Sequence, residues 1–225
     1  MKIGVFGGTF NPIHFGHLRA AEEAREILGL DKVLFIPSGN PPLKTRHLAY
    51  AADRYKMAQM ATEGNNCFEV SDIECSDTEK SYTVNTLSTL REVYKNAELF
   101  FMLGTDAFLD LPNWWRPEEL ISLADLVVLS RPGISFAALA SSPYLTMDKK
   151  ALQEFDTGKA RFCRAPLKTS REAVLTKVLP MPFSSTDIRN RISAGKSIKY
   201  LLPAQIESFI ISNKLYNNET AGRRG

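Results

Sequence analysis

Short, fully apolar runs alternate with longer amphipathic stretches over roughly the first 130 residues of the chain. The apolar runs end at Gly, Pro or polar residues, and they predict strands at 2–6, 32–37, 68–73, 98–104 and within 124–133. Between these runs, apolar residues recur at helical spacing. This spacing predicts helices at 17–30, near 50–63 and at 82–94.

This order of elements predicts an α/β fold. Continuous apolar strands separated by amphipathic helices indicate a Rossmann-like, doubly wound parallel sheet with helices on both faces. Ligands bind such sheets beyond the carboxyl ends of the strands. Four of the predicted strands run into unusual loops, GGTF, PSGNPP, GTD and SRPG, so we expect these loops to converge.

The pattern changes in the second half of the chain. Residues 134–175 give no firm assignment, because apolar, small and basic residues follow one another without a period, whereas 174–183 predict a last strand. The segment 184–195 predicts a helix with Ser185 or Thr186 as its N-cap.

A closing helix is predicted at 203–216, where Pro203 fits a first helical turn. No internal repeat and no low-complexity tract interrupts the chain. We therefore expect one domain over 1–216 with a small C-terminal helical part, followed by a flexible tail at 217–225.

The composition is close to the globular average, with 44% apolar and 24% charged residues and a net charge of +3. A charge of +3 is too small to indicate a nucleic-acid footprint. The three cysteines have no metal-ligand spacing and suit reduced thiols. Neither a signal peptide nor a membrane span is apparent, so we expect a soluble, cytoplasmic protein without nucleic-acid or membrane partners; a homo-oligomer is left open.

The Gly7-Gly8 pair follows the first predicted strand directly. Glycines at this position let backbone N–H groups approach a phosphate closely, although a Gly-Gly turn between strand and helix is often no more than a turn. The sequence has no G-x-G-x-x-G and no G-x-x-x-x-G-K-[ST] here, which excludes a classical dinucleotide fingerprint and a P-loop.

Two of the three histidines, His14 and His17, lie three residues apart at the start of the first predicted helix. Isolated histidines are most often satisfied structural residues, and a zinc pair would need a third ligand; the remaining His47 lies in a different loop. Imidazole N–H groups in this position suit a different task, the stabilisation of charge that develops on phosphate during transfer.

The segment GGTFNPIHFGH (7–17) resembles the T/H-x-G-H motif of nucleotidyltransferases, in the form found in bacterial nicotinate-mononucleotide adenylyltransferases. The segment FSSTDIR (183–189) is similar to the second motif of that family. The resemblance covers residues 1 to about 216 and is loose over 134–175. It implies an enzyme of NAD biosynthesis that takes ATP, with Mg²⁺ carried on it, and nicotinate mononucleotide.

The resemblance also implies roles for individual residues. His14 and His17 would contact the ATP phosphates and stabilise the transition state, together with Lys44 and Arg189. The residues that it assigns to ATP binding are Gly7, Gly8, Thr9, Phe10, His14, His17, Gly104, Asp106, Ser185, Thr186 and Arg189. Ser185 and Thr186 are equally explained as helix-capping residues, and both roles are compatible.

For the acceptor, the resemblance assigns the loop SGNPPLK, the element SYT and the aromatic pair of LPNWW. Thr83 would bind the nicotinate carboxylate, and the tryptophans would stack on the pyridine ring, although a Trp pair is more often core or interface. The residues implied for this side are Asn40, Lys44, Thr83, Trp114, Trp115 and Arg131. Asn11 stands where Asp is frequent, and Trp115 where Tyr is common.

The predicted reaction is a direct in-line displacement at the α-phosphate of ATP, since no nucleophilic side chain occurs in the motifs. Alternatives remain open: transfer to nicotinamide mononucleotide or to phosphopantetheine, or a non-catalytic nucleotide-binding module. A tRNA-binding module related to the class I synthetases, which carry similar HxGH-like motifs, is disfavoured by the length and the weak charge.

Overall fold

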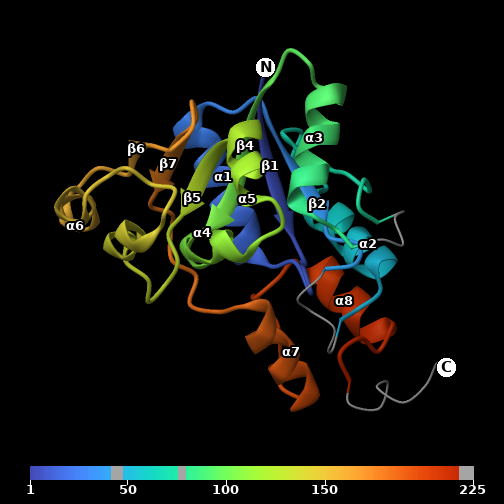
Figure 1. Cartoon of the computed structure of the whole chain (residues 1–225). Helices are drawn as coiled ribbons and strands as arrows, with labels where there is room; N and C mark the ends of the chain where they lie inside the picture. The colour runs from blue at the N-terminus through green and yellow to red at the C-terminus, as the bar shows by residue number, and fades with distance from the viewer. Residues whose placement is uncertain (42–47, 76–79, 218–225) are drawn as a thin grey trace. The chain divides into compact units, whose positions relative to one another are not determined.

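The computed structural model describes residues 1–41, 48–75 and 80–217. Its strands are β1 (Lys2–Gly8), β2 (Lys32–Pro37), β3 (Phe68–Val70), β4 (Glu98–Gly104), β5 (Asp125–Leu129), β6 (Phe162–Pro166) and β7 (Glu172–Thr176). In this part of the chain they form one seven-stranded sheet with the order β3-β2-β1-β4-β5-β7-β6 (Figure 1). The predicted α/β, Rossmann-like class is confirmed.

Helices connect most of these strands. They are α1 (Phe15–Leu28), α2 (Ala51–Thr62), α3 (Thr83–Val93), α4 (Thr105–Asp110), α5 (Pro117–Leu123), α6 (Lys149–Thr157), α7 (Ser185–Ser193) and α8 (Ala204–Ser212), with short 3₁₀ helices η1 (Leu111–Asn113) and η2 (Phe136–Ser141). No helix within the described residues is both long enough and apolar enough to span a bilayer.

The contacts of the chain divide it into two compact units. The first unit comprises Met1–Gly7, Ala20–Leu34 and Tyr82–Pro180, and the second comprises Gly8–Arg19, Phe35–Ser81 and Met181–Gly225. Each unit therefore combines segments that are far apart in the sequence.

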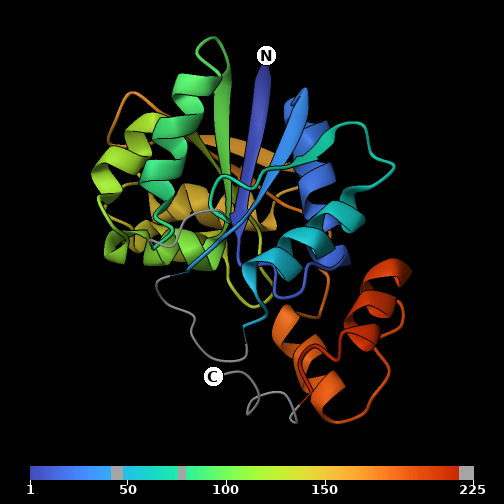
Figure 2. The same ribbon diagram turned by 90° about the vertical axis from the view of Figure 1, so that its right-hand side faces the viewer.

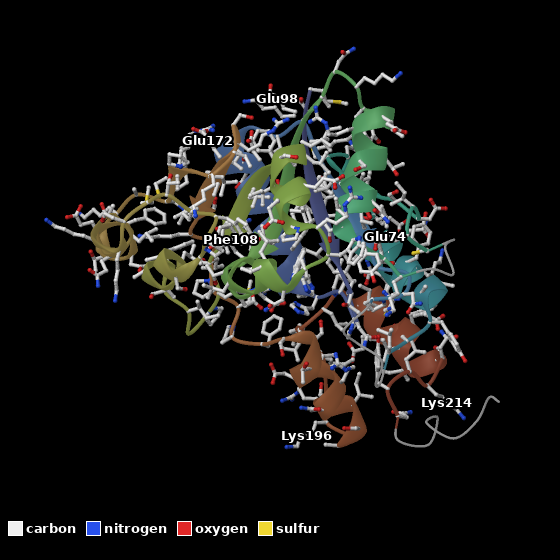
Figure 3. The ribbon with its side chains drawn as sticks, viewed as in Figure 1. Glu74, Glu98, Phe108, Glu172, Lys196 and Lys214 are labelled. Atoms are coloured by element: carbon white, nitrogen blue, oxygen red, sulfur yellow. The ribbon has the colours of Figure 1, made fainter. Side chains whose placement is uncertain are left out.

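The first unit is built on parallel pairing of β1 with β4, β4 with β5, and β5 with β7. The middle of each of these strands is buried, as expected for a parallel sheet with both faces covered. Helices α3 and α5 pack against each other, and Figure 2 shows them along one side of β4. Glu98 and Glu172, labelled in Figure 3, are the first residues of β4 and β7 and lie at the same end of these parallel strands.

The second unit is held by an aromatic cluster and by helix packing. The ring of Phe35 in β2 lies 5.8 Å from that of Phe10 and 5.0 Å from that of Phe68. Helix α8 packs against α2, and the Gln205 side chain donates a 2.9 Å hydrogen bond to the carbonyl of Met60 at this contact (Figure 1).

The structure fills the stretch 134–175 with η2, α6 and β6. Strand β6 runs antiparallel to β7 at the end of the strand order, so the sheet is not wholly parallel as predicted. Its sequence, FCRAP, is mostly exposed and contains Arg and Pro, and an edge strand of this kind lacks the continuous apolar run that identifies buried strands. The last predicted strand, 174–183, is β7, which ends at Thr176.

Candidate active site

The histidine pair lies where the loop after β1 becomes helix α1. The His14 backbone N–H donates to Nδ1 of His17 (3.2 Å), and the Gly16 N–H donates to Nδ1 of His14 (3.1 Å). A backbone N–H can only donate, so both Nδ1 atoms are acceptors. The proton of each neutral ring therefore belongs on Nε2.

The two imidazoles also contact each other. Their centroids are 3.8 Å apart, with 31° between the ring planes. A Cβ at Gly16 would lie 2.9 Å from two atoms of the His14 ring, so glycine at this position lets the ring lie over the backbone. The group that comes close to the backbone at Gly16 is thus the His14 ring itself. The helix start thus presents two rings whose orientation is fixed by the backbone.

The second motif begins at helix α7. Ser184 is the N-cap and forms a capping box with Asp187, in which Ser184 Oγ accepts from the Asp187 N–H and the Asp187 carboxylate accepts from the Ser184 N–H. The prediction that Ser185 or Thr186 caps the helix is wrong, because Ser184 is the residue with extended backbone just before the first turn. Hydrogen bonds from the Ser184 side chain and backbone hold the pKa of the exposed Asp187 carboxyl below its ordinary value.

Two of the predicted residues bond helix α7 to the loop between β1 and α1, residues 9–14, here called the histidine loop. Ser185 Oγ donates to the Pro12 carbonyl (2.8 Å), and Arg189 Nη1 donates to the Asn11 carbonyl (2.8 Å). Arg189 Nη2 also donates to the hydroxyl of Thr186 (3.2 Å). Residues far apart in sequence thus meet, as the pair of motifs predicted.

Asn11, which stands where Asp is frequent, is only 6% exposed, and hydrogen bonds hold its side chain. Its Oδ1 accepts from the Ala49 N–H (3.1 Å) and from the Tyr216 hydroxyl (2.8 Å). Burial raises the pKa of the Tyr216 hydroxyl far above its ordinary value, against the opposing effects of Arg189 and Arg54. Tyr216 therefore remains a donor at neutral pH.

Arg54 in α2 was not predicted as a site residue. Its side chain is fully buried and donates to the carbonyls of Thr9, Gly39 and Ala49. The available signal was position: Arg54 lies three and four residues before Met57 and Ala58, on the buried face of an otherwise weakly amphipathic helix.

The loop after β2 meets the loop after β1. The Ser38 N–H donates to the Gly8 carbonyl (2.9 Å), and Asn40 exchanges hydrogen bonds with Ser81. The hydroxyl of Ser38 is buried and has no hydrogen-bond partner among the described residues. The predicted residue Lys44 lies outside the described residues.

In the first unit, the loops GTD and SRPG meet at an ion pair. Arg131 Nε lies 3.4 Å from Asp106 Oδ1, and both side chains are about half exposed. A Cβ at Gly104 would lie within 3 Å of Asp106 Oδ1 and of Arg131 Nε, so a side chain at this position would force the ion pair to shift. The four loops that were expected to converge thus meet in two pairs. GTD contacts SRPG in the first unit, and the loop after β1 contacts the loop after β2 in the second unit.

The two tryptophans differ in their surroundings. Trp114 donates through Nε1 to Asp110 (3.2 Å) and packs edge-on against Phe101. Trp115 is 58% exposed and lies tilted against Tyr82, with 5.5 Å between centroids. Only Trp115 presents a largely open ring. Thr83 opens helix α3, and the side chain of its N-cap residue, Tyr82, makes no capping hydrogen bond.

No group of three or more His, Cys, Asp or Glu side chains suited to hold a metal ion occurs among the described residues. The Cys67, Cys75 and Cys163 thiols are unpaired by disulfides.

Comparisons with known proteins identify the family of the chain. The family model described as cytidylyltransferase-like matches residues 5–191. Proteins named probable nicotinate-nucleotide adenylyltransferase from Trichlorobacter lovleyi and Desulfitobacterium hafniense are 42% and 40% identical to this chain; the matches cover 96% of it and 99% and 95% of those proteins.

A solved structure of the Plasmodium falciparum nicotinic acid mononucleotide adenylyltransferase, complexed with NaAD, has a similar fold. Its TM-score is 0.70 at 18% identity, and the match covers 96% of this chain and 97% of that one.

Proposed function

The chain belongs to the cytidylyltransferase-like family, in the group that contains the probable nicotinate-nucleotide adenylyltransferases, and we propose that it transfers the adenylyl group of ATP to nicotinate mononucleotide. The products are deamido-NAD and pyrophosphate, in the biosynthesis of NAD. The observation that carries the proposal is the paired arrangement of His14 and His17, with α7 bonded to the same loop.

The histidine loop supplies groups that suit a triphosphate. With both Nδ1 atoms engaged by backbone N–H groups, each imidazole is oriented to donate from Nε2. Fixed donors stabilise charge that develops in a transition state without having to reorganise. Backbone groups beside the two histidines would come from Gly7, Gly8, Thr9 and Phe10. The nucleoside part of ATP would be bound by Gly104 and Asp106.

Helix α7 adds positive potential. The N-terminus of a helix attracts anions, and Ser185 and Thr186 lie in its first turn with Arg189 one turn later. We infer that these residues hold the β- and γ-phosphates, and that Arg189 exchanges part of its present bonding for phosphate oxygens.

We infer that the acceptor carries a flat ring with a negatively charged group. The exposed face of Trp115 offers a stacking surface, and the uncapped N-terminus of α3 at Thr83 suits a carboxylate. Asn40, Lys44 and Arg131 are proposed for the remainder of the mononucleotide. Trp114 is proposed to contribute to the same aromatic patch, with its ring held by the hydrogen bond to Asp110 and by the edge-on contact with Phe101.

In the proposed reaction, a phosphate oxygen of nicotinate mononucleotide attacks the α-phosphorus of ATP. The new P–O bond forms as the bond to the β-phosphate oxygen breaks, and pyrophosphate leaves with the electron pair. Phosphate is already a nucleophile, so catalysis rests on orientation and charge neutralisation, and orientation alone can supply about 7–11 kcal/mol.

Nucleotidyltransferases generally use a divalent metal ion with the nucleotide, and we infer that it is Mg²⁺ carried by ATP. Phosphate oxygens are preferred ligands of Mg²⁺, which would shield the charge of the triphosphate.

The test is the release of pyrophosphate by purified protein with ATP and Mg²⁺, measured in parallel with nicotinate mononucleotide, nicotinamide mononucleotide and phosphopantetheine. We expect turnover with the nicotinate compound, with deamido-NAD identified by mass. Turnover with another acceptor alone would refute the assigned acceptor. Nucleotide binding without turnover of any acceptor would refute catalysis.

A further inference from the structure

Arg54 is the largest fully buried side chain of the described structure, and all three of its guanidinium nitrogens are bonded to backbone. Nη1 donates to the Thr9 carbonyl at 2.8 Å, Nη2 to the Gly39 carbonyl at 2.9 Å and Nε to the Ala49 carbonyl at 3.0 Å. The three acceptors belong to three segments that are separate in sequence. One side chain thus joins the loop after β1, the loop after β2 and the segment just before α2.

The chemistry of these bonds requires arginine. A guanidinium is planar and directs its N–H groups outward in a fixed fork, whereas a lysine ammonium donates from a single point. Burial lowers the pKa of Arg54, while Cys75, Tyr216 and Glu74 oppose that shift. An arginine keeps its charge at neutral pH even so, and a buried charge of this kind needs all of its hydrogen bonds.

The loop after β2 is tightly held on its other side as well. A Cβ at Gly39 would lie 1.8 Å from the Glu74 carbonyl oxygen, so Gly39 has backbone on one side and the Arg54 guanidinium bonded to its carbonyl. The two loops also meet directly where the Ser38 N–H donates to the Gly8 carbonyl. Arg54 extends this contact by one residue along each loop, to Thr9 and Gly39.

We propose that Arg54 is a positioning residue that sets the distance between the loop that binds the ATP phosphates and the loop that binds the acceptor mononucleotide. This inference rests on the proposed function, which assigns Thr9 to ATP and Asn40, next to Gly39, to the acceptor. Arg54 contacts neither substrate. It acts through the two carbonyls, and it holds the reacting phosphates at the separation that in-line attack requires.

The experiment compares Arg54→Met and Arg54→Lys with Met57→Ala, a matched control. Met57 is fully buried on the same helix, so its truncation lowers stability without removing any bond to the loops. For each variant, kcat and KM for both substrates are measured below its Tm, together with the Kd for ATP from calorimetry. A displacement of about 1 Å between reactants can reduce the rate about 100-fold.

We expect both Arg54 variants to lose about 100-fold in kcat while the Kd for ATP changes by less than about threefold. Arg54→Lys keeps the charge and should be nearly as slow as Arg54→Met. The Met57→Ala variant should lose stability but keep kcat. The positioning role is refuted if Arg54→Lys has wild-type kcat, or if Met57→Ala is as slow as Arg54→Met at a similar Tm.

These outcomes are separate from those of the proposed function. Wild-type protein that forms no dinucleotide would refute the function itself. Active wild-type protein with equally active, folded Arg54 variants would refute only the role of Arg54.

Discussion

The histidine loop and the exposed ion pair of Asp106 and Arg131 follow sheet strands in the same way, yet they are held very differently. Around the histidines, side chains bond to backbone: His14 and His17 to the start of α1, and Arg189 to the Asn11 carbonyl. The Asp106–Arg131 pair is 3.4 Å apart and about half exposed.

The difference matches two kinds of task. Charge that develops in a transition state is stabilised best by donors that are already in place, and backbone bonds provide such order. Recognition of a ribose or a ring can draw on exposed groups that adjust when the ligand arrives. We therefore expect changes at the histidine loop to act on kcat, and changes at exposed groups such as Trp115 to act on KM.

The largest effect is expected at His17. In His17→Ala the ring and its Nε2–H are lost, and kcat should fall about 100-fold, as for the loss of one donor from an oxyanion hole. Steady-state kinetics with ATP and nicotinate mononucleotide measure this, with KM nearly unchanged.

Two further variants separate the catalytic role of His17 from its structural role as the acceptor of the His14 N–H. His17→Asn keeps an acceptor at the Nδ1 position for the His14 N–H but has no donor at Nε2, so it should be stable and slow. His17→Gln has its amide nitrogen near the Nε2 position and should recover part of the rate. Wild-type rates in His17→Ala or His17→Asn would exclude the assigned role.

A smaller effect is expected at Trp115, which is largely exposed. Trp115→Ala removes the stacking surface, which is worth about 1 kcal/mol, and should raise the KM for nicotinate mononucleotide about fivefold with kcat within about twofold. Trp115→Phe keeps an aromatic face and should recover most of the affinity. An unchanged KM in Trp115→Ala would show that the ring stacks on something else.

The smallest effect concerns the capping box of α7. Asp187→Asn should lower the free energy of unfolding at pH 7 by less than about 1 kcal/mol, because the carboxylate is exposed. The folded-state pKa of Asp187 is lowered, so its contribution is present above the unfolded-state pKa and is lost as pH falls through the folded-state value.

The difference between wild type and Asp187→Asn, measured by urea unfolding, should therefore shrink as the pH falls below about 4 and vanish only once the pH is below the folded-state pKa. Asp53 lies in the first turn of α2, which has no capping side chain, and Asp53→Asn is the matched control. A difference that persists unchanged at low pH would show that the carboxylate charge does not stabilise the cap.

The sequence predicted most buried strands well because their signal is continuous: 32–37 and 98–104 coincide with β2 and β4. Strand β6 escaped prediction since an edge strand needs apolar residues on one side at most. Helices α4 and α5 also escaped prediction, because they have only six and seven residues and too few turns to show a period.

The candidate site follows the same division. His14, His17, Ser185 and Arg189 belong to short motifs that can be read locally, and the structure bonds α7 to the histidine loop. The helical spacing places Arg54 on the buried face of α2, but its role depends on acceptors in three segments distant from one another. Such a role can be assigned only when those acceptors are known.

The hydrogen bond between Tyr216 and Asn11 has a consequence for the synthesis of the chain. Tyr216 donates to the Asn11 side chain across a sequence separation of 205 residues. A ribosome adds Asn11 to the chain 205 residues before Tyr216, so a nascent chain carries the entire histidine motif long before this bond is available. Prematurely stopped chains that end before residue 216 would display the motif while Asn11 lacks this partner.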